Sequence, residues 1–133
     1  MENFKLTNFL TIKGISAASG LVYSQNVLFV ISDSSNFLYQ YDIHKKLLLK
    51  FPLVKDAKEN IEKENKPDLE SITQYGNQLI MLGSGSTEKR NNMFTLDLGS
   101  DALQTQDLTS LYQKLKTVGS FSDDQLNIEG AIY

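Results

Sequence analysis

The sequence contains no cysteine and a single histidine, His44. The absence of cysteine excludes disulfide bonds, a thiolate nucleophile and any metal site that uses cysteine ligands. A single histidine also excludes the common zinc sites, which need two or more imidazoles. A Ser-His-Asp triad would have to use His44, which lies in a lysine-rich turn after a predicted strand, and we therefore expect no such triad.

The sequence also lacks long apolar runs and an excess of positive charge. No stretch approaches the roughly 18 apolar residues that a membrane-spanning helix requires, and residues 1–8 lack the basic and apolar regions of a signal peptide. The formal net charge of −3 argues against a surface that binds nucleic acid. We predict a soluble, cytoplasmic protein that binds neither nucleic acid nor a membrane.

What the chain does contain is enough apolar sequence for one folded domain. It has 133 residues, of which 41% are hydrophobic and 10% are aromatic. These values are typical of a packed globular protein and not of a disordered one. We predict a single domain spanning residues 1–133.

An internal repeat is the most informative feature of the sequence. The segment 66–86 echoes the segment 19–33, and three positions of the earlier copy recur at a constant offset (72 − 21 = 51): Leu21, Asn26 and Leu28 recur as Ile72, Asn77 and Leu79. A third copy opens at Glu129-Gly130-Ala131. A period near 50 residues predicts an architecture of stacked, similar units.

Each copy has the pattern of an antiparallel meander of short strands. We predict strands at 21–23, 27–31, 37–43 and 47–53, and again at 71–74, 78–82 and 92–98, with a further edge strand at 7–12. Four-stranded meanders that repeat with this period are typical of β-propeller blades. We predict an all-β fold, a partial β-propeller with blade units near 16–54 and 67–106 and a third starting near 127.

Two insertions interrupt the meanders. The charged run 55–66 predicts a solvated surface loop or a frayed helix, with a docking arm as the alternative. The second insertion predicts a short helix over 108–118 that Asp107 caps and Gly119 ends. One face of this helix is apolar and is expected to pack on a blade; it carries Leu108, Leu111, Tyr112, Leu115 and Val118.

Five segments resemble an uncharacterised bacterial β-propeller family that is similar to the esterase-like phytase and SdiA-regulated propellers. The matching segments are 16–21, 31–33, 66–72, 83–90 and 126–131, of which the block 66–90 is the most specific. The resemblance implies a propeller of about twice this length, so that this chain corresponds to its N-terminal half. It implies no activity. If the chain ends at Tyr133, its open edge strands predict self-association.

Acidic residues stand just before or at the first strand of the later copies. Ser19, Glu70 and Glu129 occupy equivalent places in the repeat, and in a propeller these places surround the central channel. Two converging carboxylates, Glu70 and Glu129, would bind a hard cation such as calcium or act as a general acid and base. Alternatively, they accept backbone hydrogen bonds between blades.

A second candidate set follows the second strand of each copy. Asp33 follows the strand in the earlier copy, and Ser84, Ser86 and Arg90 follow it in the later one. Arg90 would clamp a phosphate or carboxylate, with glycine-rich backbone beside it. An ordinary hairpin loop explains the same glycines, and no P-loop pattern is present.

These residues lead to three functional hypotheses. The leading one is a binding or scaffold module whose channel takes a small polar ligand or a cation, calcium being the candidate. The alternative is a metal-dependent hydrolase of the phytase-like or phosphodiesterase-like kind, in which Glu70 and Glu129 act around the metal. The third is a structural interaction domain that assembles through open sheet edges. Whether the protein is an enzyme stays open at this point.

Overall fold

The computed structural model describes residues 4–122 and 125–133. Within these residues the chain forms two four-stranded antiparallel sheets, ordered β1-β2-β3-β4 and β5-β6-β7-β8. The first sheet consists of β1 (Ala18–Ser24), β2 (Val27–Ser32), β3 (Phe37–Asp42) and β4 (Leu47–Pro52). The second consists of β5 (Leu69–Tyr75), β6 (Gln78–Gly83), β7 (Asn92–Asp97) and β8 (Leu103–Asp107). The all-β class and the four-stranded antiparallel meanders are confirmed.

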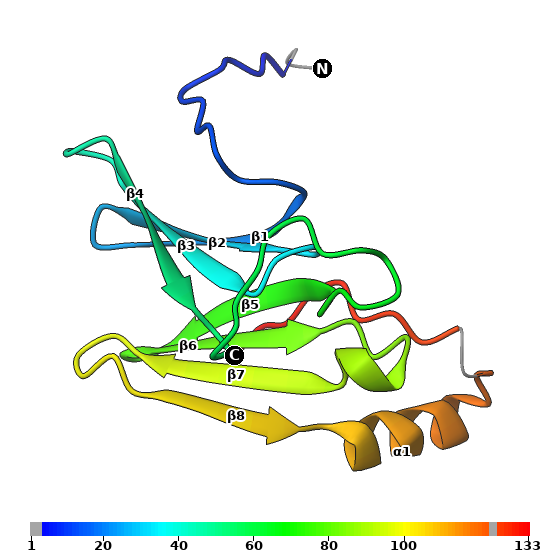
Figure 1. Ribbon diagram of the computed structural model, residues 1–133. Helices are drawn as coiled ribbons and strands as arrows, with labels where there is room; N and C mark the ends of the chain where they lie inside the picture. The colour runs from blue at the N-terminus through cyan, green and yellow to red at the C-terminus, as the bar shows by residue number, and fades with distance from the viewer. Residues whose placement is uncertain (1–3, 123–124) are drawn as a thin grey trace.

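The two sheets lie one over the other and bury a common core between them (Figure 1). β5 packs against β1 and β2, so the first strands of the two sheets are neighbours. Because side chains alternate across a strand, one face of each sheet supplies the core. The core residues come from both sheets: Phe29, Ile31, Leu38, Leu53, Leu69, Ile72, Leu79, Met81, Phe94 and Leu96.

The repeat extends to the details of the backbone. The pairing register shifts between Ala18 and Gly20 in β1, and it shifts again between Leu69 and Ser71 in β5. The residue before each of these strands has a left-handed backbone, with φ of 45° at Ala17 and 52° at Asp68. In both sheets the carbonyl of that residue accepts a hydrogen bond from the residue after the second strand. The equivalence that the sequence predicts is therefore present in three dimensions.

The connection between copies also recurs. The amide of Asp68, at the start of β5, donates to the carbonyl of Asp33, at 3.0 Å, and the amide of Ile128 donates to the carbonyl of Ser84, at 2.8 Å. Residues 128–133 thus begin beside the second sheet much as β5 begins beside the first. No strand is assigned within residues 125–133.

One local prediction is wrong, and another is confirmed with an added contact. Residues 7–12 form no strand, since they find no partner for their backbone groups, and the Phe9 side chain is 87% exposed. The run 55–66 is a loop without helix, but it is more than a solvated surface, because the Glu59 carboxylate accepts hydrogen bonds from Tyr39 and Lys50. Burial and the Glu59 contact together raise the pKa of Tyr39 to about 12.

The predicted helix is present as α1 (Thr109–Gly119), following a 3-10 turn η1 (Glu88–Arg90) earlier in the chain. The Asp107 carboxylate accepts a hydrogen bond from the Thr109 amide, at 2.7 Å, near its predicted capping role. Two features differ from the prediction. The residue that caps the start of the helix is Leu108 and not Asp107, and the left-handed residue that caps its end, with φ of 55°, is Ser120 and not Gly119.

The apolar face of α1 is only half covered. Leu108 and Tyr112 are buried against Leu126 and against Leu82 and Met93 of the central strands β6 and β7. Leu111 and Val118 remain 48% and 77% exposed, because the sheet and residues 125–128 contact only one flank of the helix. In the part of the chain that the structure describes, no helix is long and apolar enough to cross a membrane.

We expect Leu79→Ala to lower the free energy of unfolding by about 2–5 kcal/mol, because the fully buried Leu79 side chain fills the core between the sheets. Urea denaturation monitored by circular dichroism measures this change. Leu115→Ala is the matched control, since Leu115 is 39% exposed on α1, and its effect should stay under about 1 kcal/mol. Equal losses in the two variants would contradict the assigned core.

Candidate functional site

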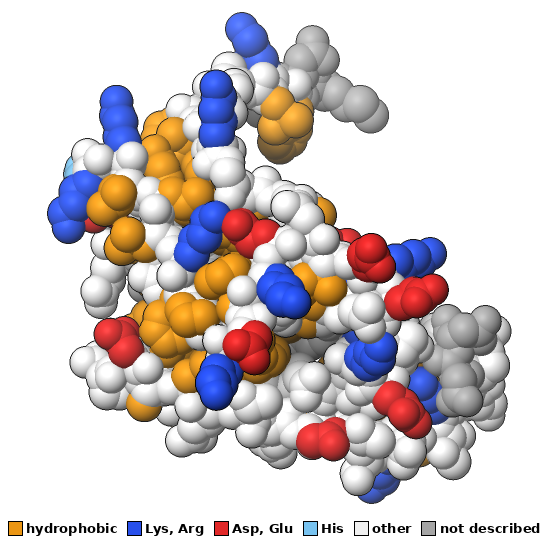
Figure 2. Space-filling view, in the orientation of Figure 1, with side chains coloured by type: hydrophobic (Ala, Val, Ile, Leu, Met, Phe, Trp, Pro, Cys, Tyr) orange, Lys and Arg blue, Asp and Glu red, His pale blue; other side chains and the backbone are white. Residues whose placement is uncertain are grey.

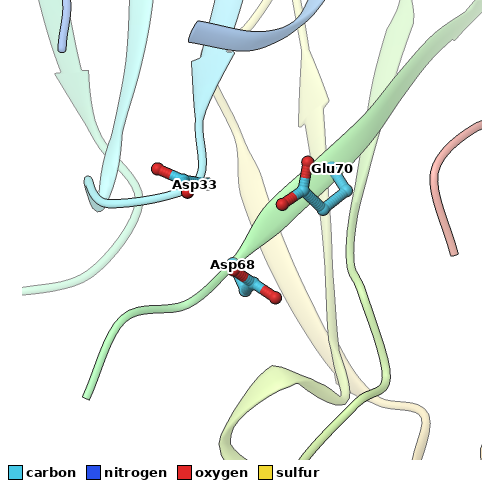
Figure 3. Close-up of side chains that lie close together, drawn as sticks. All are labelled: Asp33, Asp68 and Glu70. Atoms are coloured by element: carbon cyan, nitrogen blue, oxygen red, sulfur yellow. The ribbon is translucent and has the colours of Figure 1, made fainter. Parts of the chain in front are cut away.

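Polar residues gather where β2 and β6 end and β5 begins. Asp33 follows β2, Asp68 immediately precedes β5, and Glu70 lies in β5. Carboxylate oxygens of these three residues all lie within 4.8 Å of one another (Figure 3). The repeat brings them together, because β5 starts beside the turn that ends β2. This acidic cluster, Asp33, Asp68 and Glu70, is the candidate site.

Lys66 joins the two sheets at this place. Its Nζ lies 2.6 Å from Asp33 Oδ2 and 2.6 Å from Asp68 Oδ1. The Lys66 side chain is only 17% exposed. Burial opposes its charge, but the hydrogen bonds to the two aspartates outweigh that effect, and the pKa of Lys66 is raised. Lys66 is therefore a fixed cation between Asp33 and Asp68.

The predicted anion clamp, Arg90, is engaged within the protein. Its Nη1 lies 3.0 Å from Asp68 Oδ2 and donates to Ser86 Oγ at 2.7 Å. Its Nη2 donates to the Lys63 carbonyl at 3.0 Å. In this arrangement the guanidinium braces the loop before η1 against the loop before β5. A role for Arg90 toward an external anion stays a prediction.

Ser84 and Ser86 complete the environment of Asp68. Ser84 is fully buried, and its hydroxyl donates to Asp68 Oδ2 at 2.6 Å. The Ser84 and Ser86 hydroxyls lie 2.9 Å apart. Burial alone would raise the pKa of Asp68, but the bonds from Lys66 and Ser84 and the charge of Arg90 keep it below its ordinary value. Asp68 is thus an anion at neutral pH.

Glu70 differs from its neighbours because no described residue serves as its counter-ion. Within the described residues it forms no hydrogen bond or ion pair, although it is partly buried. Burial, followed by the charges of Asp68, Glu129 and Asp33, raises the pKa of Glu70 to about 7, and Lys66 opposes this only in part. A carboxyl group with this pKa exchanges its proton near neutrality.

The predicted convergence of Glu70 and Glu129 is consistent with this arrangement, since the Glu129 charge acts on Glu70. Glu129 itself is exposed and accepts a hydrogen bond from the Asn127 side chain. Ser19, the equivalent position in the earlier copy, has no carboxylate, and its hydroxyl donates a hydrogen bond to the Leu69 carbonyl. It therefore joins β1 to β5.

Sequence reasoning missed Lys66 and Asp68 as site residues. Both stand in the Lys-Pro-Asp-Leu-Glu block that the repeat and the resemblance singled out, but the repeat places Ala17 opposite Asp68 and thus carries no acidic signal. Only the fold shows that Asp68 contacts residues from two loops far along the chain. In addition, Asp33 Oδ1 is buried and has no hydrogen-bond partner in the described structure.

A comparison with protein families settles where the chain belongs. The model of a family of unknown function, DUF6929, matches residues 14–133. This chain is a member of the DUF6929 family. The match covers both sheets, α1 and all residues of the candidate site, so all of these features lie within the part of the chain that matches the family. The family description assigns no activity to them.

Comparisons with individual proteins are less informative. Among solved structures, the N-terminal domain of Nup159 is similar with a TM-score of 0.47 and 16% sequence identity over 74% of this chain. The DUF6929 chain spans 23% of the length of that domain's chain. A likeness of this size does not indicate a shared function. No curated protein matches the chain significantly.

We expect Asp68→Asn to lower the free energy of unfolding by about 3–5 kcal/mol, because it leaves the buried charges of Lys66 and Arg90 without their shared anion. Chemical denaturation at neutral pH measures the change. The control is Asp101→Asn, the same substitution at an exposed position, which should alter stability little. A small loss in Asp68→Asn would show that the network is not buried as described.

The pH dependence of stability should reveal the raised pKa of the Glu70 carboxyl group. Its pKa is about 7 in the folded state and near 4.5 in the unfolded chain, so the folded protein holds this proton more tightly. The contribution of Glu70 to stability therefore decreases as pH rises between these two values. In Glu70→Gln this decrease should disappear. Denaturation of the unaltered protein and of Glu70→Gln across this pH window measures how the difference in their stability changes with pH. For the exposed control Glu88→Gln, the difference from the unaltered protein should stay constant.

Proposed function

We propose that this DUF6929 protein is a binding module with the architecture of a partial β-propeller, and that its ligand is a hard divalent cation held at Glu70. The architecture is supported by the two equivalent four-stranded sheets and by the recurring backbone connection to residues 128–133. The ligand follows from the candidate site, which lies where the first strands of successive units are neighbours. Calcium is the cation that the donor set favours.

One observation carries the proposal: Glu70 is a partly buried carboxylate with acidic neighbours and no partner of its own among the described residues. Holding an unpaired anion in such a place costs free energy. A bound cation removes this cost, since it neutralises Glu70 and satisfies Asp33 Oδ1, the buried oxygen without a hydrogen bond. Glu129, whose charge already acts on Glu70, is a third donor on the exposed side.

The fixed charges limit how strong this binding is. Lys66 and Arg90 neutralise two of the carboxylates, so the protein offers a net negative site only through Glu70 and Glu129. Calcium commonly takes about six to eight oxygen ligands, and water would complete the set around a few protein oxygens. Such a site resembles the weaker, solvent-exposed calcium sites of proteins and not a closed structural cage.

The hydrolase alternative draws support from the same residue. A carboxyl group with a pKa of about 7 is suited to general acid-base chemistry at neutral pH. Among the described residues of the site, the hydroxyl bonded to a carboxylate is that of Ser84, which is fully buried, and its partner Asp68 is a weak base because its pKa is lowered. Binding therefore ranks ahead of catalysis, and turnover of phosphate-ester or carboxylic-ester substrates that depends on Glu70 would reverse that order.

We expect calcium to raise the melting temperature at about pH 8, where Glu70 is ionised. The shift should be smaller at about pH 6, because calcium must then displace the Glu70 proton. In Glu70→Gln the shift should be lost, whereas the exposed control Glu88→Gln should keep it. Differential scanning fluorimetry at constant ionic strength measures these values. An equal shift in both variants, or no shift in the unaltered protein, would refute the cation site.

A further inference from the structure

The first sheet ends in an edge strand, β4, that begins with consecutive leucines. β3 pairs with one side of β4, and no strand among the described residues pairs with its other side. The outward backbone N–H and C=O groups of β4 are therefore open to pairing with another strand. Leu47, Leu48 and Leu49 follow one another at the start of this edge.

Two of these leucines lie uncovered on one side of the sheet. Phe51 packs against the core, and because side chains alternate along a strand, Leu47 and Leu49 lie on the same side as Phe51. Leu47 is 47% exposed and Leu49 is 54% exposed. We call these two residues the leucine strip. The β3–β4 hairpin projects away from the second sheet (Figure 1), and hydrophobic side chains gather over it in Figure 2.

The repeat provides an internal comparison, because β8 is the corresponding edge strand of the second sheet. Leu49 lies opposite Gln40 in β3. Gln104 lies opposite Thr95 in β7, and both of these partners stand two residues before the aspartate that ends their strand. Gln104 is thus the equivalent of Leu49 and is likewise exposed. The fold therefore does not require an apolar residue at this place.

We propose that two copies of this chain associate through β4, with the two β4 strands paired antiparallel about a two-fold axis at Leu49. Leu49 of one copy then lies directly opposite Leu49 of the other, and Leu47 lies opposite Phe51 of the other. The two leucine strips cover each other on one side of the joined sheet, while the open backbone groups of both edges are paired. Such a contact is isologous, so it closes at two copies.

The charge of Lys50 favours this register. Pairing centred on Leu49 sets Lys50 opposite Leu48 of the other copy, whereas pairing centred on Lys50 would place like charges directly opposite each other. Lys50 Nζ lies 2.6 Å from Glu59 Oε2, and by alternation this ion pair stands on the side of the sheet away from the leucine strip. Pro52, which has no backbone N–H, ends the strand and limits the pairing to the residues before it.

Single cysteines test the pairing directly, because the sequence contains none. Leu49→Cys should form a disulfide-linked dimer under mild oxidation, since residues directly opposite in antiparallel strands have Cα atoms about 4.5–5.5 Å apart, within disulfide range. Leu47→Cys is the matched control, with similar exposure on the same side of the same strand. In the proposed register its two thiols lie about 13 Å apart along the strands and should not cross-link.

Sedimentation equilibrium measures the association without a cross-link. A contact through one strand from each copy is small, so the dimer of the unaltered protein should appear at high protein concentration. Leu49→Lys should lose this dimer, because it sets like charges opposite each other at the axis. Gln104→Lys places the same charge at the equivalent position of β8 and should keep the dimer. A chelator should not change the dimer, since no residue of β4 belongs to the acidic cluster.

The expected result is cross-linking of Leu49→Cys but not of Leu47→Cys, with the dimer lost in Leu49→Lys and kept in Gln104→Lys. Equal cross-linking of the two cysteine variants indicates random collision and would overturn the proposal. Cross-linking of Leu47→Cys alone, or of neither variant, would overturn it as well. Circular dichroism and melting temperature establish that each variant is folded, and the cysteine variants decide the question if Leu49→Lys is not.

Discussion

The ion pairs and hydrogen bonds of the Asp68 carboxylate are the interactions that hold the candidate site together. The carboxylate accepts hydrogen bonds or ion pairs from Lys66, Ser84 and Arg90, and Lys66 also reaches Asp33 beside the other sheet. A buried carboxylate remains charged only with such partners. The need to satisfy this one anion therefore holds the loops after β2, before β5 and after β6 in a single arrangement, at the place where the two sheets meet.

The chemistry of the site follows from which carboxylates Lys66 and Arg90 neutralise. Both fixed cations pair with aspartates, and no residue within the described ranges 4–122 and 125–133 is a counter-ion of Glu70. Burial and acidic neighbours then raise its pKa to about 7. A network that stabilises the fold thus leaves one carboxylate without a counter-ion, and the cation site that we propose uses this carboxylate. The proposed site and the stability of the fold therefore draw on the same small set of charges.

The stacking of the two equivalent sheets forms the core of the molecule. The packing of one sheet on the next buries Ile72 and its neighbours and supplies most of the core. The register shift in each first strand and the left-handed residue before that strand recur in both sheets, so this interface joins two units of the same construction.

The sequence by itself determined the all-β class, the two meanders and the helix near 109–119. These features depend on local alternation of side chains and on a repeat, both of which can be read along the chain. Only the tertiary structure decided that Arg90 pairs with Asp68 and that residues 7–12 have no strand partner. The physical reason is that neutralisation and strand pairing join groups distant in sequence, and no local pattern of residues specifies which of several charges or edges will meet.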